Sequence, residues 1–254
     1  MGSMRLVTSL TLAFLLCASA ARAALVLDQA FGDPASNRFG VAYFFTTPAF
    51  PQYGIPSNDQ AQTFTVGVAG SLVGAGMWLG ACCPDPNLVV TEPLQIQLRR
   101  TVNGVPSNDP ADVLSSVYLT QAQINAAELD DPNHRGYGWF LLSFSSAPAV
   151  SIGDVLALVM VHYGTQDPNL QEEQVYKAQG DYTILDNPPY TVPMYDGGEA
   201  LFASSADGVW KPQGTAFEAW DMFFATYVQT PEPAGAWLSA LALLIPFAAR
   251  SRSD

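Results

Sequence analysis

The stretch LQIQLRRTV, residues 94–102, decides the fold class. Its apolar and polar side chains alternate, so that Leu94, Ile96, Leu98 and Val102 share one face. A period of two residues is typical of a β-strand with one buried face, because successive side chains of a strand point to opposite sides. This stretch therefore predicts a strand of a half-buried antiparallel sheet.

Further strand-like runs lie on both sides of this stretch. AQTFTVGV repeats the alternation, whereas other runs are more continuously apolar, as expected for strands inside a two-layer stack: FGVAYFF, SLVGAGMWLG, YGWFLLSF, DVLALVMVHY and DMFFATYV. Trp139, Trp220 and Phe224 are expected to fill the core of that stack or to fix long loops. Segments rich in Pro, Gly, Asn and Asp separate the runs and favour turns: NDQ, GVPSNDPAD, DDPNHRG, SAPAVSIGD, TQDPNLQEE and DNPPY.

One short helix is predicted. Thr120 stands before QAQINAAEL, and Gln123 follows it at the spacing of a capping box, in which the two side chains bond reciprocally to backbone N–H groups. Many short strands with almost no helix predict an all-β, antiparallel, jelly-roll-like β-sandwich over residues 24–229. An N-terminal signal helix and a C-terminal apolar helix are expected to flank it.

The first 23 residues have the three parts of a secretory signal peptide. Arg5 supplies a positive leader, residues 6–16 are mostly apolar, and Ala21 and Ala23 are the small residues that a signal peptidase reads. We expect cleavage before Ala24.

The last part of the chain, residues 230–254, also has three parts in order. A Pro-Glu-Pro motif at 231–233 is followed by an apolar segment at 234–249 and then by Arg250 and Arg252. At about 1.5 Å per residue the apolar segment is short for a hydrocarbon core about 30 Å thick. The arginines are expected on the cytoplasmic side.

This C-terminal order resembles the PEP-CTERM sorting signal of Gram-negative bacteria. In that family an integral-membrane exosortase is thought to recognise the motif and to process the tail. The resemblance implies that Pro231, Glu232 and Pro233 are the recognition residues, with Arg250 and Arg252 as a split basic cluster. A plain single-span anchor is the alternative, and the sequence leaves open whether the segment is cleaved or kept.

The body, roughly residues 61–228, is similar to bodies found before such tails. The order runs from QTFTVG and GSL to LQIQLRRTVNGVPS, then to WFLLSFSSAPAVSIGDVLALVM, and ends at DMFFATYV. Exported proteins of this look adopt jelly-roll sandwiches similar to carbohydrate-binding modules, so the resemblance implies a fold more than a function.

The charge balance excludes one class of partner. The chain has 23 acidic and 10 basic residues and a formal net charge of −13. Such a polyanion is repelled by phosphate backbones, so nucleic-acid binding is not expected.

The cysteines give no disulfide framework. Apart from the signal segment only the neighbours Cys82 and Cys83 occur. A vicinal disulfide, an intermolecular bridge and two reduced thiols are the alternatives, and the sequence does not choose among them.

No catalytic motif supports an enzyme. GxSxG, P-loop, dinucleotide and HExxH patterns are missing, and neither His134 nor His162 lies near a nucleophile motif. We predict a non-enzymatic protein without a cofactor. A glycoside-acting hydrolase is kept as an alternative, because it needs only two carboxylates that folding brings together.

Aromatic residues in a loop-rich segment suggest sugar binding. Tyr190, Tyr195 and Trp210 stand among Gly, Pro and Asp residues, and exposed rings can stack on sugar faces. The alternative is that these rings fill the core or fix long loops.

A calcium ion that holds loops together is the second candidate ligand. Asp28, Asp33, Asp196, Glu199 and Asp207 lie in loop-like segments, and Asp196 and Asp207 are the weak candidate ligands. No EF-hand spacing is present, and solvated turn acids are the alternative.

Together these patterns predict a protein of the cell surface or extracellular matrix. Signal peptidase and an exosortase are its expected export partners, with transient insertion in the inner membrane, and extracellular polysaccharide is the candidate ligand. A structural protein of a biofilm matrix without a ligand is the rival prediction.

Overall fold

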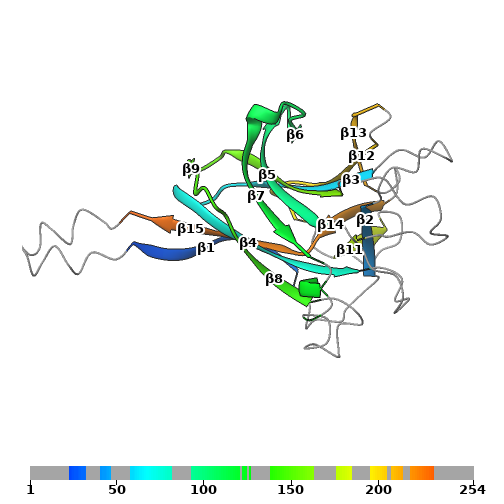
Figure 1. Cartoon of the computed structure of the whole chain (residues 1–254). Helices are drawn as coiled ribbons and strands as arrows, with labels where there is room; N and C mark the ends of the chain where they lie inside the picture. Colours follow the sequence, from blue (N-terminus) through cyan, green and yellow to red (C-terminus); the bar gives the residue numbers. More distant parts are fainter. Residues whose placement is uncertain are drawn as a thin grey trace, which may run out of the picture. The chain divides into compact units, whose positions relative to one another are not determined.

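The computed structural model describes part of the chain, and all statements below concern that part. The described residues are 23–32, 41–46, 58–81, 93–120, 122–124, 126, 138–162, 176–184, 195–204, 207–213 and 218–231. They are almost entirely β-strands in two antiparallel sheets, which confirms the all-β sandwich (Figure 1).

One sheet has eight strands. These are β1 (Ala24–Phe31), β2 (Val41–Thr46), β4 (Gly70–Ala81), β8 (Gly138–Ser143), β9 (Ala149–Val150), β11 (Tyr176–Ile184), β14 (Glu218–Met222) and β15 (Phe224–Thr230). Its order is β1-β15-β4-β11-β14, while β8 and β9 pair with β4 and β2 pairs with β11.

The other sheet has seven strands. These are β3 (Asn58–Thr65), β5 (Leu94–Val102), β6 (Val105–Pro106), β7 (Val113–Leu119), β10 (Val155–His162), β12 (Ala200–Ser204) and β13 (Trp210–Pro212). Its order is β13-β12-β3-β10-β5-β6, and β7 pairs with β5. A turn of 3₁₀ helix, η2 (Pro110–Asp112), precedes β7.

Two compact units are distinguished along the chain. Residues 27–228 form one, and residues 1–26 together with 229–254 form the other. Within the second unit the hydroxyl of Thr230 donates to the carbonyl of Ala24 at 3.4 Å.

The main core lies between the two sheets and takes side chains from both. The predicted strand at residues 94–102 is β5, and Leu94, Ile96 and Leu98 are fully buried. Val102 is 53% exposed because the pairing of β10 with β5 ends at Arg100. The main core consists of these residues: Phe64, Val66, Leu72, Ala75, Met77, Leu79, Leu94, Ile96, Leu98, Leu119, Ile124, Leu142, Phe144, Val150, Leu156, Leu158, Met160, Ala200, Met222, Phe224 and Val228.

The large aromatic residues divide between core and surface. Phe224 is buried, with its ring centroid 5.9 Å from that of Phe64, as expected for a core residue. Trp139 is partly exposed and packs instead beside Trp78, at 5.7 Å between ring centroids, where Gly76 leaves room for its ring. The side chain of Trp220 lies outside the described residues.

The predicted helix start is confirmed at the level of single hydrogen bonds. The Gln123 side chain accepts from the N–H of Thr120 at 2.9 Å, and the Thr120 hydroxyl accepts from the N–H of Gln123 at 3.3 Å. Residues 122–124 and 126 are helical, and Ile124 is buried in the main core. The capping box holds this short turn because each side chain satisfies a backbone donor of the other.

Two predicted boundaries are wrong. The turn expected at NDQ is the start of β3, where Gln60 pairs with Met160 of β10 and with Phe202 of β12. The run DMFFATYV, expected as one strand, is divided at Phe223 between β14 and β15. In the first case, the pairing of Gln60 with strands on both sides outweighed the preference of this segment for a turn. The two predicted terminal helices lie outside the described residues, among which no helix is long and apolar enough to cross a membrane.

A buried carboxyl joins the two sheets inside the sandwich. Gln62 of β3 donates to Asp221 of β14 at 2.9 Å and accepts from the N–H of Met222 at 2.7 Å. The N–H of Tyr195 also donates to Asp221, at 3.3 Å. Burial raises the pKa of Asp221 to about 7, the bonds from Gln62 and Tyr195 oppose the rise, and the charge of Glu199 adds to it.

We predict that Asp221→Asn flattens the pH dependence of stability between pH 3.8 and about 7. The native state binds the proton more tightly than the unfolded chain, so the free energy of unfolding falls as the pH rises through this window. The slope that one such group contributes is at most about 1.4 kcal/mol per pH unit. Urea unfolding at several pH values measures it.

Asp112→Asn is the control for this measurement. Asp112 makes a long surface ion pair with Arg100, 3.9 Å between Nε and Oδ1, and such pairs contribute little. Its variant should keep the wild-type slope. An unchanged slope in Asp221→Asn would contradict the assignment.

Candidate functional site

The face of the seven-stranded sheet that points away from the main core carries mostly alanine and valine among its buried apolar residues. We call it the outer face. Its apolar residues form a second cluster, against which Val105 packs from β6: Ala61, Ala157, Val159, Val161, Leu201, Ala203 and Trp210. Small residues leave room for long polar side chains to lie across the strands.

One row of residues crosses the outer face from edge to edge. On one side, Tyr118 of β7 pairs with Gln95 of β5, which pairs with Val161 of β10. On the other side, Asp59 of β3 pairs with Ala203 of β12, which pairs with Trp210 of β13.

The two halves meet between β10 and β3. Met160 and Gln60 are the last pair of these two strands, and Val161 and Asp59 are the positions directly beyond it. The row thus has an aromatic residue at each end and a polar residue near each of them.

A continuous chain of hydrogen bonds runs along β5 on this face. Gln95 Nε2 donates to the Tyr118 hydroxyl at 2.7 Å, and Gln97 Nε2 donates to Gln95 Oε1 at 2.9 Å. Arg99 Nε donates to Gln97 Oε1 at 2.6 Å, and Arg99 Nη1 donates to the Ser107 carbonyl at 3.2 Å. We call this the glutamine ladder. Both glutamines are buried, so their bonds satisfy groups that water does not reach.

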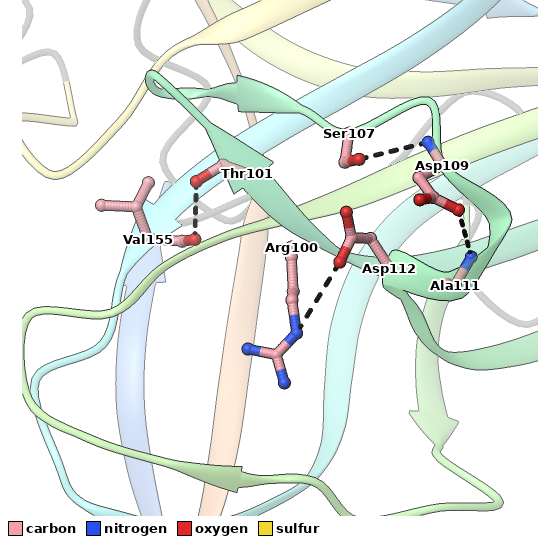
Figure 2. A network of polar contacts seen from close by, with 7 residues as sticks. All are labelled: Arg100, Thr101, Ser107, Asp109, Ala111, Asp112 and Val155. Carbon is pink, nitrogen blue, oxygen red and sulfur yellow. Dashed lines mark hydrogen bonds and ion pairs between the residues drawn. The ribbon is translucent and has the colours of Figure 1, made fainter.

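The connection from β6 to β7 is fixed at its base. Figure 2 shows that Ser107 Oγ accepts from the N–H of Asp109 at 3.1 Å, and that Asp109 Oδ1 accepts from the N–H of Ala111 at 2.9 Å. The ion pair between Arg100 and Asp112 lies beside them. Because Ser107 is thereby held, its carbonyl is a fixed acceptor for the end of the glutamine ladder.

The same connection reaches the β12–β13 hairpin. The Asn108 amide donates to the Gly208 carbonyl at 2.8 Å, and Asn108 Oδ1 accepts from the Trp210 indole N–H at 3.1 Å. This bridge ties the two ends of the outer face together across segments 100 residues apart in sequence.

Tyr118 is the exposed element of the row. Its side chain is 58% exposed, and among the side chains that the structure describes no other aromatic residue is in the exposed class. The bond from Gln95 fixes the hydroxyl, so the ring is presented in a defined orientation. An exposed, oriented ring can stack on an apolar face of a ligand.

Asp59 is the charged element of the row. Its side chain is partly buried, and this burial raises the pKa of the carboxyl to about 6, while the nearby positive charge of Arg99 opposes the rise. At neutral pH most of this carboxyl is therefore ionised, and in mild acid it is protonated.

The predicted trio of sugar-binding aromatics is not assembled. Trp210 is only 8% exposed and its indole N–H is already bound by Asn108, so the prediction that its ring is exposed is wrong. Tyr195 packs edge-on against Phe224 on the side of the main core, at 5.1 Å between ring centroids. Its hydroxyl donates to Gln29 at 3.0 Å. Tyr190 lies outside the described residues.

The weak calcium candidates are spread over the surface. Asp207 makes an ion pair with Lys211 at 2.7 Å, and the hydrogen bond from Lys211 holds the pKa of Asp207 below its ordinary value. Asp196 and Glu199 are exposed. Within the described ranges, no group of three or more His, Cys, Asp or Glu side chains is placed to hold a metal ion.

Asp28, the other described calcium candidate, is a structural clamp. Its Oδ1 accepts from the N–H groups of Gly67 and Val68 at 2.8 and 2.6 Å, and its Oδ2 accepts from the hydroxyl of Thr226 at 3.2 Å. The carboxylate thus joins β1 to the turn between β3 and β4. Asp33 lies outside the described residues.

The predicted export signals fall largely outside the described part of the chain. Ala23 and Pro231 are described, and each is exposed next to a terminal strand, before β1 and after β15 respectively. His162 is a residue of β10, as its strand-like context predicted. These predicted residues are not described: Ala21, Cys82, Cys83, His134, Glu232, Pro233, Arg250 and Arg252.

Sequence reasoning missed the residues that build the outer face. In the quoted strand only the apolar positions were weighed, although Gln95, Gln97 and Arg99 occupy every alternate position. The available signal was that two glutamines, Gln95 and Gln97, alternate with the apolar residues of a strand expected to be half buried. Such glutamines need hydrogen-bond partners if they are buried in the fold. Asp59 was assigned to a turn, and Tyr118 gave no local signal because β7 pairs with β5 only in the fold.

We predict that Gln97→Leu lowers the free energy of unfolding by about 1–3 kcal/mol. Leucine removes both bonds of the ladder's central amide and leaves Gln95 Oε1 and Arg99 Nε without that partner. Chemical unfolding measures the loss. Ser116→Ala, at the paired position of β7, is the control and should change stability by less than about 0.5 kcal/mol. Equal stability of both variants would contradict the structural role of the ladder.

No protein-family model and no curated protein matches the chain. Among solved structures, the chain is similar to a crystal structure that contains the cysteine protease and lectin-like domains of Cwp84, a surface layer associated protein of Clostridium difficile. The two chains share 14% identity with a TM-score of 0.40, and the match covers 74% of this chain and 36% of that chain. A likeness at this level carries no argument about the function of the present protein.

Proposed function

We propose that this protein is an exported, non-enzymatic protein of the cell surface or extracellular matrix, and that it binds polysaccharide at the end of the outer face where Tyr118 lies. The observation that carries the proposal is the exposed ring of Tyr118, oriented by the buried amide of Gln95. A rigid aromatic ring beside polar groups suits a sugar, which has apolar faces and a rim of hydroxyls.

The ring of Tyr118 is the part of the row that a sugar can reach. Gln95, Val161, Ala203 and Trp210 are buried, and Val105 of β6 packs on the apolar cluster of the same face. The proposed contact is therefore made at the end of the row where Tyr118 lies.

The strand boundaries support the export part of the proposal. β1 begins at Ala24, the residue expected after signal-peptide cleavage, and β15 ends at Thr230, directly before the Pro-Glu-Pro motif. The described strands therefore occupy the span between the two proposed signals. We propose that this span is a jelly-roll-type body, and that the tail is recognised by an exosortase.

We predict that Tyr118→Ala weakens polysaccharide binding at least about tenfold, because stacking on an aromatic ring contributes about 1–3 kcal/mol in comparable platforms. Affinity electrophoresis and calorimetry with soluble starch, galactomannan and hydroxyethylcellulose measure it. Tyr118→Phe keeps the ring but loses the bond from Gln95, and should fall between wild type and alanine.

Leu141→Ala is the matched control for this prediction. Leu141 is 68% exposed, and it lies on β8 of the eight-stranded sheet. Its variant should bind like wild type. If the wild-type protein binds none of these polysaccharides, or if all variants bind alike, a structural matrix protein without this ligand becomes the better account.

We predict that the protein recovered from its own host begins at Ala24 and lacks its arginine tail beyond residue 249. Intact-mass spectrometry with terminal peptide mapping measures both ends. Substituting Pro231 and Pro233 by Ala should leave the N-terminal cleavage unchanged and retain the tail. An unprocessed tail in wild type would favour the single-span anchor, and a retained N-terminal segment would overturn export by signal peptidase.

A further inference from the structure

The first strand of the eight-stranded sheet lies outside the main core. Among the described strands β1 pairs only with β15, and the two run side by side (Figure 1). No residue of β1 is buried, whereas Phe224, Ala225, Thr226 and Val228 of β15 are. Phe31, at the end of β1, packs against the main core and is only partly buried. The buried residues of the main core thus all belong to segments other than β1.

The groups that hold β1 include a charged attachment. Asp28 Oδ1 accepts from the N–H groups of Gly67 and Val68 at 2.8 and 2.6 Å, and Asp28 Oδ2 accepts from the Thr226 hydroxyl at 3.2 Å. The two N–H groups lie in the turn between β3 and β4, and Thr226 lies on β15. Hydrogen bonds to a charged acceptor are stronger than neutral ones, so this carboxylate fixes the position of β1.

Gln29 and Phe31 complete the attachment. The N–H of Gln29 donates to Thr226 Oγ1 at 3.1 Å, and its side-chain oxygen accepts from the Tyr195 hydroxyl at 3.0 Å. The ring of Phe31 lies 6.2 Å from that of Tyr195 between centroids. We call the residues that contact these side chains the β1 acceptor: Gly67, Val68, Tyr195 and Thr226. Every copy of the chain carries this acceptor, so it can hold its own β1 or the β1 of another copy.

The connection after β1 is long enough for a second path. Gly32 follows β1 with a φ of 83°, a conformation that glycine adopts readily. Residues 32–40, GDPASNRFG, join β1 to β2. A stretch of this length spans on the order of 30 Å when it is extended, which is about the diameter of a small domain. This reach allows β1 to enter the acceptor of a neighbouring copy.

We propose that β1 is exchanged between copies of this chain, so that β1 of one copy occupies the β1 acceptor of a second copy. This inference rests on the export part of the proposed function, because cleavage before Ala24 gives β1 the free end that must enter the second copy. A second copy is the partner that fits, because its β1 brings the same Asp28, Gln29 and Phe31 to the acceptor. Exchange of an identical element is a low-cost route to assembly.

Two exposed leucines favour the exchange. Leu25 and Leu27 of β1 are 66% and 55% exposed, and apolar side chains on an edge strand are a surface that a second copy can cover. The polar bonds of β1 are the same within one chain and between two chains, so they do not oppose the exchange. The assembled fraction of the protein should therefore rise with its concentration, which light scattering on the protein recovered from its host measures.

The test uses two variants that are secreted together from the same cells. Asp28→Ala damages β1, Thr226→Val damages the acceptor, and each variant alone loses the bond between these two side chains. If the strands exchange, β1 of the Thr226→Val copy meets the intact acceptor of the Asp28→Ala copy. Native mass spectrometry measures the ratio of mixed to like dimers, which should exceed the value for random pairing at least about fivefold.

The control reverses the sign of the effect. The double variant Asp28→Ala/Thr226→Val is secreted together with wild type, so that both strand contacts of a mixed dimer are damaged while those of a wild-type dimer are intact. Mixed dimers should then fall below random pairing by a similar factor. Assembly through any other surface would leave both mixtures at random pairing.

A milder pair of variants keeps the test valid if the first pair folds poorly. Gln29→Met and Tyr195→Phe each remove the neutral hydrogen bond between these two side chains. Their mixture should be enriched in mixed dimers at least about twofold. Thermal unfolding confirms that each variant is folded.

The outcomes separate the two proposals. If the protein from its host keeps the segment before Ala24, export by signal peptidase fails and the inference falls with it. If the protein begins at Ala24 but stays monomeric at every concentration, export stands and the exchange is wrong. The exchange is also wrong if dimers form but both mixtures pair at random.

Discussion

Burial of β10 on both faces is the constraint on which the rest of the structure depends. Leu156, Leu158 and Met160 lie in the main core, while Ala157, Val159 and Val161 lie in the cluster of the outer face, and all six are buried. The backbone groups of a strand that is buried on both faces cannot bond to water, so they need partner strands on both edges. These partners are β3 and β5. The eight-stranded sheet covers the inner side chains of β10, and its outer side chains form part of the second apolar cluster on the outer face.

The polar groups of the fold are arranged around this double burial. On the inner side, Gln62 of β3 reaches across to Asp221 and bonds the opposite sheet. On the outer side, Gln95 and Gln97 of β5 bond each other because no water is available to them. The polar side chains of β3 and β5 thus form hydrogen-bond networks, which fix the positions of these side chains more firmly than apolar packing alone. Tyr118 is the exposed end of the outer network. Through its hydrogen bond with Gln95, the buried part of this face orients the ring of the candidate site.

The predictions from the sequence succeeded where the signal was local. The alternation at residues 94–102 gave the bounds of β5, and the spacing of Thr120 and Gln123 gave the capping box. They failed where pairing overrode local propensity. Asn58 to Gln60 read as a turn, yet they extend β3, because β12 pairs with all three residues and β10 also pairs with Gln60. Trp210 read as an exposed loop aromatic, yet β13 pairs with β12 and buries it.

The sequence by itself determined the all-β class, the main strands and the anionic character, because period, turn residues and charge are properties of neighbouring positions. Only the tertiary structure decided which residues share the outer face. Tyr118, Gln95 and Asp59 belong to three different strands, and they share one face only through the register of the strand pairs. Register depends on long-range pairing, and a slip of one residue would reverse every side chain. The candidate site is therefore determined by the pairing of strands and not by any single segment of the sequence.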